Sequence, residues 1–155
     1  MLSKILVMAL ITAGMAAQDN PIPRTTTVTV QGFKVELKRC EKVSTKIVSC
    51  YLVITNLQAD RMLVLGGRGQ PSHNVLASYY VDSGGMLVEG SSSQLGSSTN
   101  EYYSQTELVT DTPARGRVEF AVGDPRATSL AKLAFGFSAL TSFRAEFRKV
   151  PLEGN

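Results

Sequence analysis

The stretch FKVELKRCEKVSTKIVSCYLVITN, residues 33–56, contains both cysteines of the chain and decides the fold. Apolar and charged side chains alternate in FKVELKR, and KIVSCYLVITN is dense in β-branched residues; both patterns are typical of half-buried strands. A hairpin centred on Thr45 would place Cys40 opposite Cys50. We therefore predict a disulfide within this hairpin, which would contribute roughly 2.8 kcal/mol by closing a loop of about 11 residues.

Other chemistry at Cys40 and Cys50 has less support. Thioredoxin-like redox sites use Cys-x-x-Cys, and a zinc site would need two further ligands, whereas the chain has one histidine, His73. The same hairpin register pairs Leu37 with Val53 and leaves Leu52 and Ile54 on the disulfide face, beside charged residues. Two explanations stay open. Either a β-bulge switches the faces near the turn, or Leu52 and Ile54 form an interface with another element or subunit.

The rest of the chain indicates more short strands and no long amphipathic helix. Ser-rich residues 91–105 are expected to form a long loop or frayed edge strands, and residues 126–135 fit either a strand or a helical turn. Turn residues recur about every ten positions, which is typical of an antiparallel sandwich or barrel. We expect an all-β fold, an immunoglobulin-like antiparallel β-sandwich of about seven to nine strands. Further strands are predicted near residues 25–30, 62–65, 74–82, 86–90, 117–122, 129–137 and 142–150.

The first residues of the chain predict a secretory signal peptide. Lys4 precedes an apolar run at residues 5–13, and small Gly14 and Ala16 occupy the two positions that the peptidase reads for cleavage after Ala16. We expect removal of residues 1–16, an extended arm at residues 17–25 and one β-sandwich domain at residues 26–152. No second apolar run is long enough to span a bilayer, which takes about 20 residues. The mature protein is expected to be periplasmic, secreted or at the cell surface, with no membrane span.

Charge and motifs exclude several functions and leave one enzyme class open. The formal net charge is +3 with no dense Lys/Arg run, so nucleic acid is not an expected partner. We expect no metal, no cofactor and no catalytic residues, because His73 is the one base available to a nucleophilic serine. A small hydrolase using paired carboxylates stays open, because such a pair can be distant along the chain.

Four segments resemble the telokin-like, immunoglobulin-like domains of secreted bacterial proteins. They are CYLVITNLQADRMLVL (50–65), YYVDSGGMLVEG (79–90), ELVTDTPARGRVEFAV (107–122) and FRAEFRKVPL (143–152). The resemblance rests on a strand ending in Thr-Asn, an Asp-x-x-Gly turn, and a Pro-x-x-Gly loop before a Val-x-Phe strand. It covers roughly residues 28–152 and implies a fold but no activity.

Adjacent tyrosines suggest a binding surface. In a strand, one member of each pair Tyr79–Tyr80 and Tyr102–Tyr103 should face outward, although outward tyrosines are also ordinary on strands. Exposed tyrosines beside a polar loop suit a protein or carbohydrate interface. The candidate surface comprises Tyr80, Tyr102, Tyr103, Arg68 and His73.

The function expected from these features is a secreted, non-enzymatic binding or structural module of a bacterial envelope or cell-surface assembly. A protein partner or self-assembly is favoured over a small molecule, and a glycan is an alternative ligand. One form of self-assembly would add the Thr-rich segment RTTTVTV (24–30) to a neighbour's sheet edge. The alternatives are an inhibitor or chaperone-like partner of another secreted protein, and the hydrolase described above.

Overall fold

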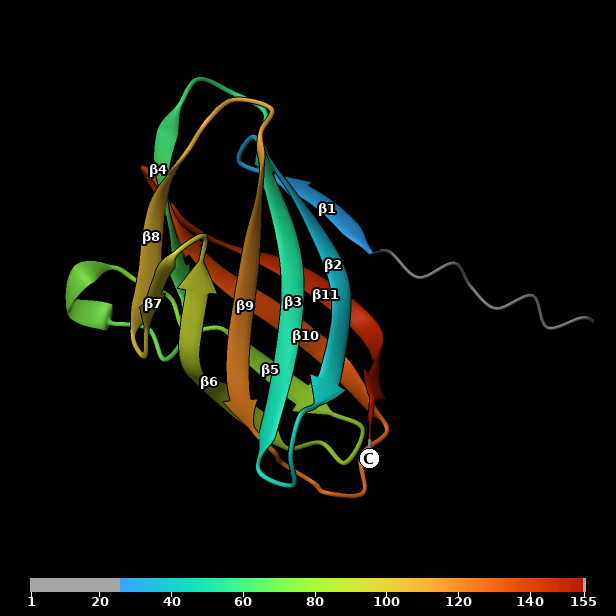
Figure 1. Ribbon diagram of the computed structural model, residues 1–155. Coiled ribbons are helices and arrows are strands. Elements are labelled where there is room, and N and C mark those ends of the chain that lie inside the picture. The colour runs from blue at the N-terminus through green and yellow to red at the C-terminus, as the bar shows by residue number, and fades with distance from the viewer. Residues whose placement is uncertain (1–25, 155) are drawn as a thin grey trace, which may run out of the picture.

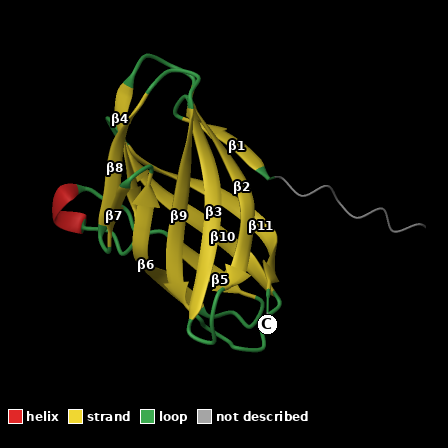
Figure 2. Cartoon of the chain, viewed as in Figure 1, coloured by secondary structure: helices red, strands yellow, loops and turns green. Residues whose placement is uncertain are grey.

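The computed structural model describes residues 26–154, which form eleven strands and one short 3-10 helix (Figure 1, Figure 2). The predicted signal peptide, residues 1–16, and the predicted arm, residues 17–25, lie outside the described residues. In the described part, no helix has the length and apolar character that crossing a membrane requires. The elements are β1 (Thr27–Val30), β2 (Phe33–Lys42), β3 (Ile47–Asn56), β4 (Arg61–Gly66), η1 (Pro71–His73), β5 (Tyr79–Asp82), β6 (Leu87–Leu95), β7 (Ser98–Asn100), β8 (Tyr103–Leu108), β9 (Pro113–Ala121), β10 (Ser129–Ser138) and β11 (Ser142–Glu153).

Seven strands form a closed ring in the order β2, β3, β9, β6, β5, β10 and β11. Neighbours in the ring are antiparallel except at the joint between β11 and β2, which is parallel. There, Leu152 pairs with Cys40 and Glu153 pairs with Glu41. In Figure 1, β6, β9, β3 and β2 lie side by side at the front, and β10 and β11 lie behind them.

The seven strands pair into a ring only along part of their length. Elsewhere β10 and β2 have other neighbours, and the strands form two layers. Strand β10 pairs with β5 along residues 130–134 and with β4 along residues 136–138. Strand β2 likewise pairs with β1 through residues 33–36 and meets β11 only beyond the bulge. The all-β class and the disulfide are confirmed. The closed ring differs from the two unconnected sheets of the expected immunoglobulin-like sandwich.

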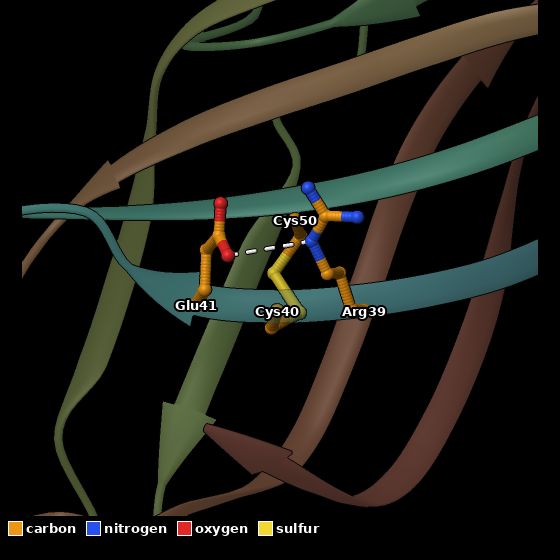
Figure 3. Close-up of a disulfide and its surroundings, with 4 residues drawn as sticks. All are labelled: Arg39, Cys40, Glu41 and Cys50. Atoms are coloured by element: carbon orange, nitrogen blue, oxygen red, sulfur yellow. Dashed lines mark hydrogen bonds and ion pairs between the residues drawn. A yellow bond between two sulfur atoms is a disulfide. The ribbon is translucent and has the colours of Figure 1, made fainter. Parts of the chain in front are cut away.

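The cysteine hairpin forms as predicted, but its register differs on the far side of the disulfide. Cys40 and Cys50 are bonded directly across β2 and β3, with their Cα atoms 4.1 Å apart (Figure 3). Leu37 pairs with Leu52 rather than Val53, because the register shifts between Leu37 and Arg39. The β-bulge at Lys38 is thus the correct one of the two explanations.

Because of the bulge, the apolar side chains of β2 on both sides of Lys38 face the core. Phe33, Val35 and Leu37 point into the core before the bulge, and Cys40 does so after it. Across β3, the core side chains are therefore those of the even-numbered residues. Leu52 and Ile54 are 1% and 0% exposed. The prediction that Leu52 and Ile54 form an interface is wrong, because their side chains fill the interior.

Two other segments, one Thr-rich and one Ser-rich, form strands. The strand expected near residues 25–30 forms as β1, Thr27–Val30, which pairs with the protein's own β2 along one of its two edges. The Ser-rich middle forms β6, β7 and β8, with Ser93 and Ser104 buried. Ser104 donates a hydrogen bond to the Ser93 hydroxyl, which donates to the Leu65 carbonyl oxygen. These internal bonds satisfy serines that a sequence pattern assigns to solvent.

The connection between β4 and β5, residues 67–78, crosses the outer face of β10. Gly66 and Gly136 are paired across β4 and β10, and a Cβ at either position would overlap the Leu76 carbonyl oxygen. Glycine is required here because one backbone lies directly on another. Ser78, which is fully buried, fastens the connection. Its hydroxyl donates to the Gly66 carbonyl oxygen at 2.5 Å and accepts from the Gly136 N–H at 3.0 Å.

Candidate functional site

A groove of about 580 Å³ lies on the outer face of the four strands at the front of Figure 1, β2, β3, β9 and β6. Side chains on this face point away from the core because residues alternate between the two faces of a strand. The bulge in β2 adds to the groove, since it leaves the consecutive residues Lys38 and Arg39 both exposed. The groove, here called the Tyr51 groove, is lined by Lys38, Arg39, Tyr51, Leu52, Val53, Gln94, Gly96, Arg115, Gly116 and Arg117.

Tyr51 lies at the centre of a row of side chains that crosses four strands. It pairs with Arg39 of β2 on one side and with Arg117 of β9 on the other, and Arg117 pairs with Gln94 of β6. The guanidinium carbon of Arg39 lies 4.4 Å from the centre of the Tyr51 ring. This distance is within the range of a cation–π contact, which holds the Arg39 head over the ring.

Acidic residues neighbour the cations but stand outside the groove. Arg39 Nε is 3.3 Å from Glu41 Oε2 (Figure 3), and Arg117 Nη2 is 3.6 Å from Glu119 Oε1. These are pairs of solvent-accessible side chains on the same strand. Exposed pairs of this kind are worth about 0.2–1 kcal/mol, so a ligand can compete for the arginines at little cost.

The lining of the Tyr51 groove contains four cations, Lys38, Arg39, Arg115 and Arg117, and no carboxylate. A guanidinium presents a planar set of N–H donors that matches carboxylate, sulfate and phosphate groups. Gln94 adds an amide to the same row. The chemistry of the groove is therefore that of binding an anion with several oxygen acceptors.

A second groove, of about 140 Å³, lies beside the first at the joint of β2 and β11. Its lining shares Lys38 and Arg39 with the Tyr51 groove and adds Arg148 of β11. One carboxylate, Glu153, is also part of it. The full lining is Thr26, Leu37, Lys38, Arg39, Cys40, Arg148, Val150, Pro151 and Glu153.

The structure brings together part of the surface predicted from sequence. The Arg68 backbone N–H donates to the Glu101 carbonyl oxygen at 2.9 Å, and the Arg68 guanidinium carbon lies 5.7 Å from the centre of the Tyr102 ring. Tyr102 is 40% exposed, whereas Tyr103 begins β8 and is half-buried. Arg68 and Tyr102 thus form a small exposed pair at the edge of the molecule.

Tyr80 does not belong to a binding surface, contrary to the prediction. It is 1% exposed, and its ring packs edge-on against Phe120 in the core. Its hydroxyl donates to the Ala121 carbonyl oxygen at 2.7 Å and accepts from the Gly123 N–H at 2.8 Å. Burial raises the pKa of the Tyr80 hydroxyl above its ordinary value of 10.0. The outward member of the Tyr79–Tyr80 pair is Tyr79, with Lys132 and Arg144 each 5.3 Å from its ring.

His73 lies apart from Arg68 and Tyr102, in η1, and its Nδ1 is 3.1 Å from the Ser72 hydroxyl. It lines a third, open groove of about 850 Å³ that also contains Glu89 and Arg144. Among residues 26–154, no group of three or more His, Cys, Asp and Glu side chains is arranged to hold a metal ion. Each of the three grooves has at most one carboxylate in its lining.

No protein-family model matches this sequence, and no curated protein matches it. The Tyr51 groove was not predicted from the sequence. The groove's central row comes from three strands, in Arg39, Tyr51 and Arg117, and an unbulged register with Leu52 on the outer face would place Tyr51 in the core. The one local signal was the charged face of FKVELKR, which alone does not distinguish a binding groove from a solvated strand.

Proposed function

We propose that this protein is a non-enzymatic binding module of a secreted or cell-surface assembly, and that the Tyr51 groove binds an anionic ligand. The observation that carries the proposal is the groove's lining of four cations without a carboxylate. The row through Arg39, Tyr51 and Arg117 adds an aromatic ring between two guanidinium groups. Such a row offers charge, hydrogen-bond donors and a flat contact surface at one place.

Binding accounts for the grooves better than catalysis does. Glycoside hydrolysis needs two carboxyl groups facing each other across the scissile bond, and none of the three grooves contains two. Hydrogen bonds hold the pKa of Asp60 and of Asp124 below the ordinary value of 3.8. A catalytic acid needs a pKa shifted in the opposite direction.

The proposed location outside the cytoplasm rests on two independent features. The Cys40–Cys50 disulfide is buried, and disulfides persist in oxidising compartments. The amino-acid pattern of residues 1–16 is that of a secretory signal peptide. A place among the telokin-like, immunoglobulin-like domains of secreted bacterial proteins is part of the same proposal, and its support is the set of turn and strand motifs in the sequence.

The test is binding of the oxidised protein to dextran sulfate, with uncharged dextran as the control polymer, measured by affinity electrophoresis. We expect dextran sulfate to retard the protein and uncharged dextran to leave its mobility unchanged. Arg117→Gln and Arg39→Gln should each weaken binding by about two- to fivefold, the equivalent of one exposed ion pair.

Arg126→Gln is the matched control, because it removes one equally charged side chain that is 90% exposed and outside both basic grooves. It should bind as the unmodified protein does. Equal weakening by Arg117→Gln and Arg126→Gln would show that net charge alone drives binding. The proposal would then fail, as it would if dextran sulfate had no effect on mobility.

A further inference from the structure

The two basic grooves are continuous, and their junction is the β-bulge of β2. An unbulged strand would turn one of Lys38 and Arg39 toward the core. The bulge instead exposes both residues, and both line both grooves. Bulges commonly re-aim side chains next to binding sites. Here the bulge converts two separate pockets into one track of cations.

We propose that this track binds a linear acidic polysaccharide that runs from Gln94 on β6 to Arg148 on β11. The proposal rests on the function proposed above and adds the class and length of the ligand. The path crosses β6, β9, β3, β2 and β11, which at about 4.8 Å per strand gives a span of roughly 19 Å. This span exceeds one monosaccharide and suits a chain of several sugars.

The charges along the track fit a polymer with repeated acidic groups. Its cations, in order across the sheet, belong to β9, β2 and β11, and Glu153 is the one carboxylate in the two linings. Within residues 26–154, Arg115 and Arg148 form no ion pair, so both are available to a ligand. The cations are Arg115, Arg117, Lys38, Arg39 and Arg148.

The remaining side chains favour a polysaccharide over the other polyanions. Single-stranded nucleic acid binds to successive aromatic residues on which bases stack, whereas Tyr51 is the one aromatic side chain in the two linings. A protein partner often inserts an arginine as its anchor, and such an anchor would meet four cations in the Tyr51 groove. A sugar chain needs acidic-group contacts, hydroxyl contacts such as Gln94 offers, and one flat ring.

The experiment compares a heparin disaccharide with a heparin octasaccharide by isothermal titration calorimetry, using the oxidised protein at low and physiological salt. The octasaccharide should bind at least about tenfold more tightly, because it reaches both grooves. Arg148→Gln should weaken octasaccharide binding by about two- to fivefold and leave disaccharide binding unchanged. Arg117→Gln should weaken both, and Arg126→Gln neither. Urea unfolding of each variant should match the unmodified protein, because these side chains are on the surface.

The possible results separate the two proposals. If Arg117→Gln weakens octasaccharide binding but Arg148→Gln does not, the continuous track is refuted while the Tyr51 groove stands. If neither oligosaccharide binds, the track and the proposed function both fail. If a single-stranded oligonucleotide of the same net charge binds more tightly than the octasaccharide and depends equally on Arg117 and Arg148, the ligand class is wrong.

Discussion

Replacing Ser78 by alanine tests how the connection over β10 is held in place. Ser78 is fully buried and makes one hydrogen bond to each of the paired strands β4 and β10. Ser78→Ala removes the acceptor of the Gly136 N–H, and a buried unsatisfied donor costs about 1–3 kcal/mol. It also removes the donor to the Gly66 carbonyl oxygen, a hydrogen bond worth about 0.5–1.5 kcal/mol. The expected loss is about 1.5–4.5 kcal/mol, a large part of the stability of a domain.

Urea unfolding followed by far-UV circular dichroism measures this loss, since the chain has no tryptophan to report by fluorescence. The midpoint should fall while the slope of the unfolding free energy against urea stays the same. The amide proton of Gly136 should also exchange faster in the variant. Ser83→Ala, at an exposed serine, should change stability by less than about 0.5 kcal/mol. If Ser78→Ala and Ser83→Ala unfold at the same urea concentration, the two buried hydrogen bonds do not hold the connection and the reasoning is refuted.

Three further perturbations have definite expected outcomes. Replacing Cys40 and Cys50 together by alanine should lower the free energy of unfolding in urea by about 3 kcal/mol, and a stability equal to that of the oxidised protein would contradict this. Tyr80→Phe should cost about 1–3 kcal/mol at neutral pH because two backbone groups lose a buried partner. The folded-state pKa of Tyr80 is raised, so the stabilisation by its hydroxyl is complete below pH 10.0 and is lost at higher pH. Tyr80→Phe should therefore lose less stability at alkaline pH than the unmodified protein does. An unchanged alkaline profile would contradict this assignment. Hydrogen bonds from Thr110 lower the pKa of Asp60. The stabilisation of the fold by the Asp60 carboxylate is therefore present above pH 3.8 and is lost as the pH falls through the folded-state pKa. Asp60→Asn should therefore flatten the acid limb of stability against pH, and an acid limb as steep as before would exclude this carboxylate as its source.

The strands could largely be predicted from sequence because alternation is a local property. FKVELKR and KIVSCYLVITN carry the period of two, and the cysteine spacing correctly centred the hairpin on Thr45. The closure of the sheet could not be predicted. It depends on the parallel joint of Leu152 and Glu153 with β2, which no local pattern indicates.

The difference between the expected and the observed register of β2 and β3 explains why the Tyr51 groove could not be predicted from the sequence. One inserted residue, Lys38, reverses which side chains of β2 face the core. An unbulged register would place Tyr51 in the interior and Leu52 outside. The side-chain period of a strand is two, so a shift of one residue exchanges its two faces. The shift lets Phe33, Val35 and Leu37 share the core face with Cys40, so that Tyr51, paired with Arg39 and Arg117, faces outward.

In the Ser-rich region, the choice between a loop and edge strands could not be made from the sequence for a different reason. Residues 91–105 lack apolar alternation because the inward positions of β6 and β8 include Ser93 and Ser104. A buried serine is acceptable when its hydroxyl has a partner. That partner comes from another strand, Leu65 of β4 for Ser93, so it cannot be read from the local sequence.

The parallel joint between β11 and β2 also bears on the motions of the domain. Elsewhere the pairing is longer; β3, for example, is paired with β9 from Ile47 to Thr55. The joint, in contrast, consists of Leu152 and Glu153 at the end of the last strand. Local opening has its lowest free energy where few backbone hydrogen bonds must break. We expect the hydrogen bonds between β11 and β2 to break and re-form locally. The ring should therefore open and reclose at this joint many times for each global unfolding event.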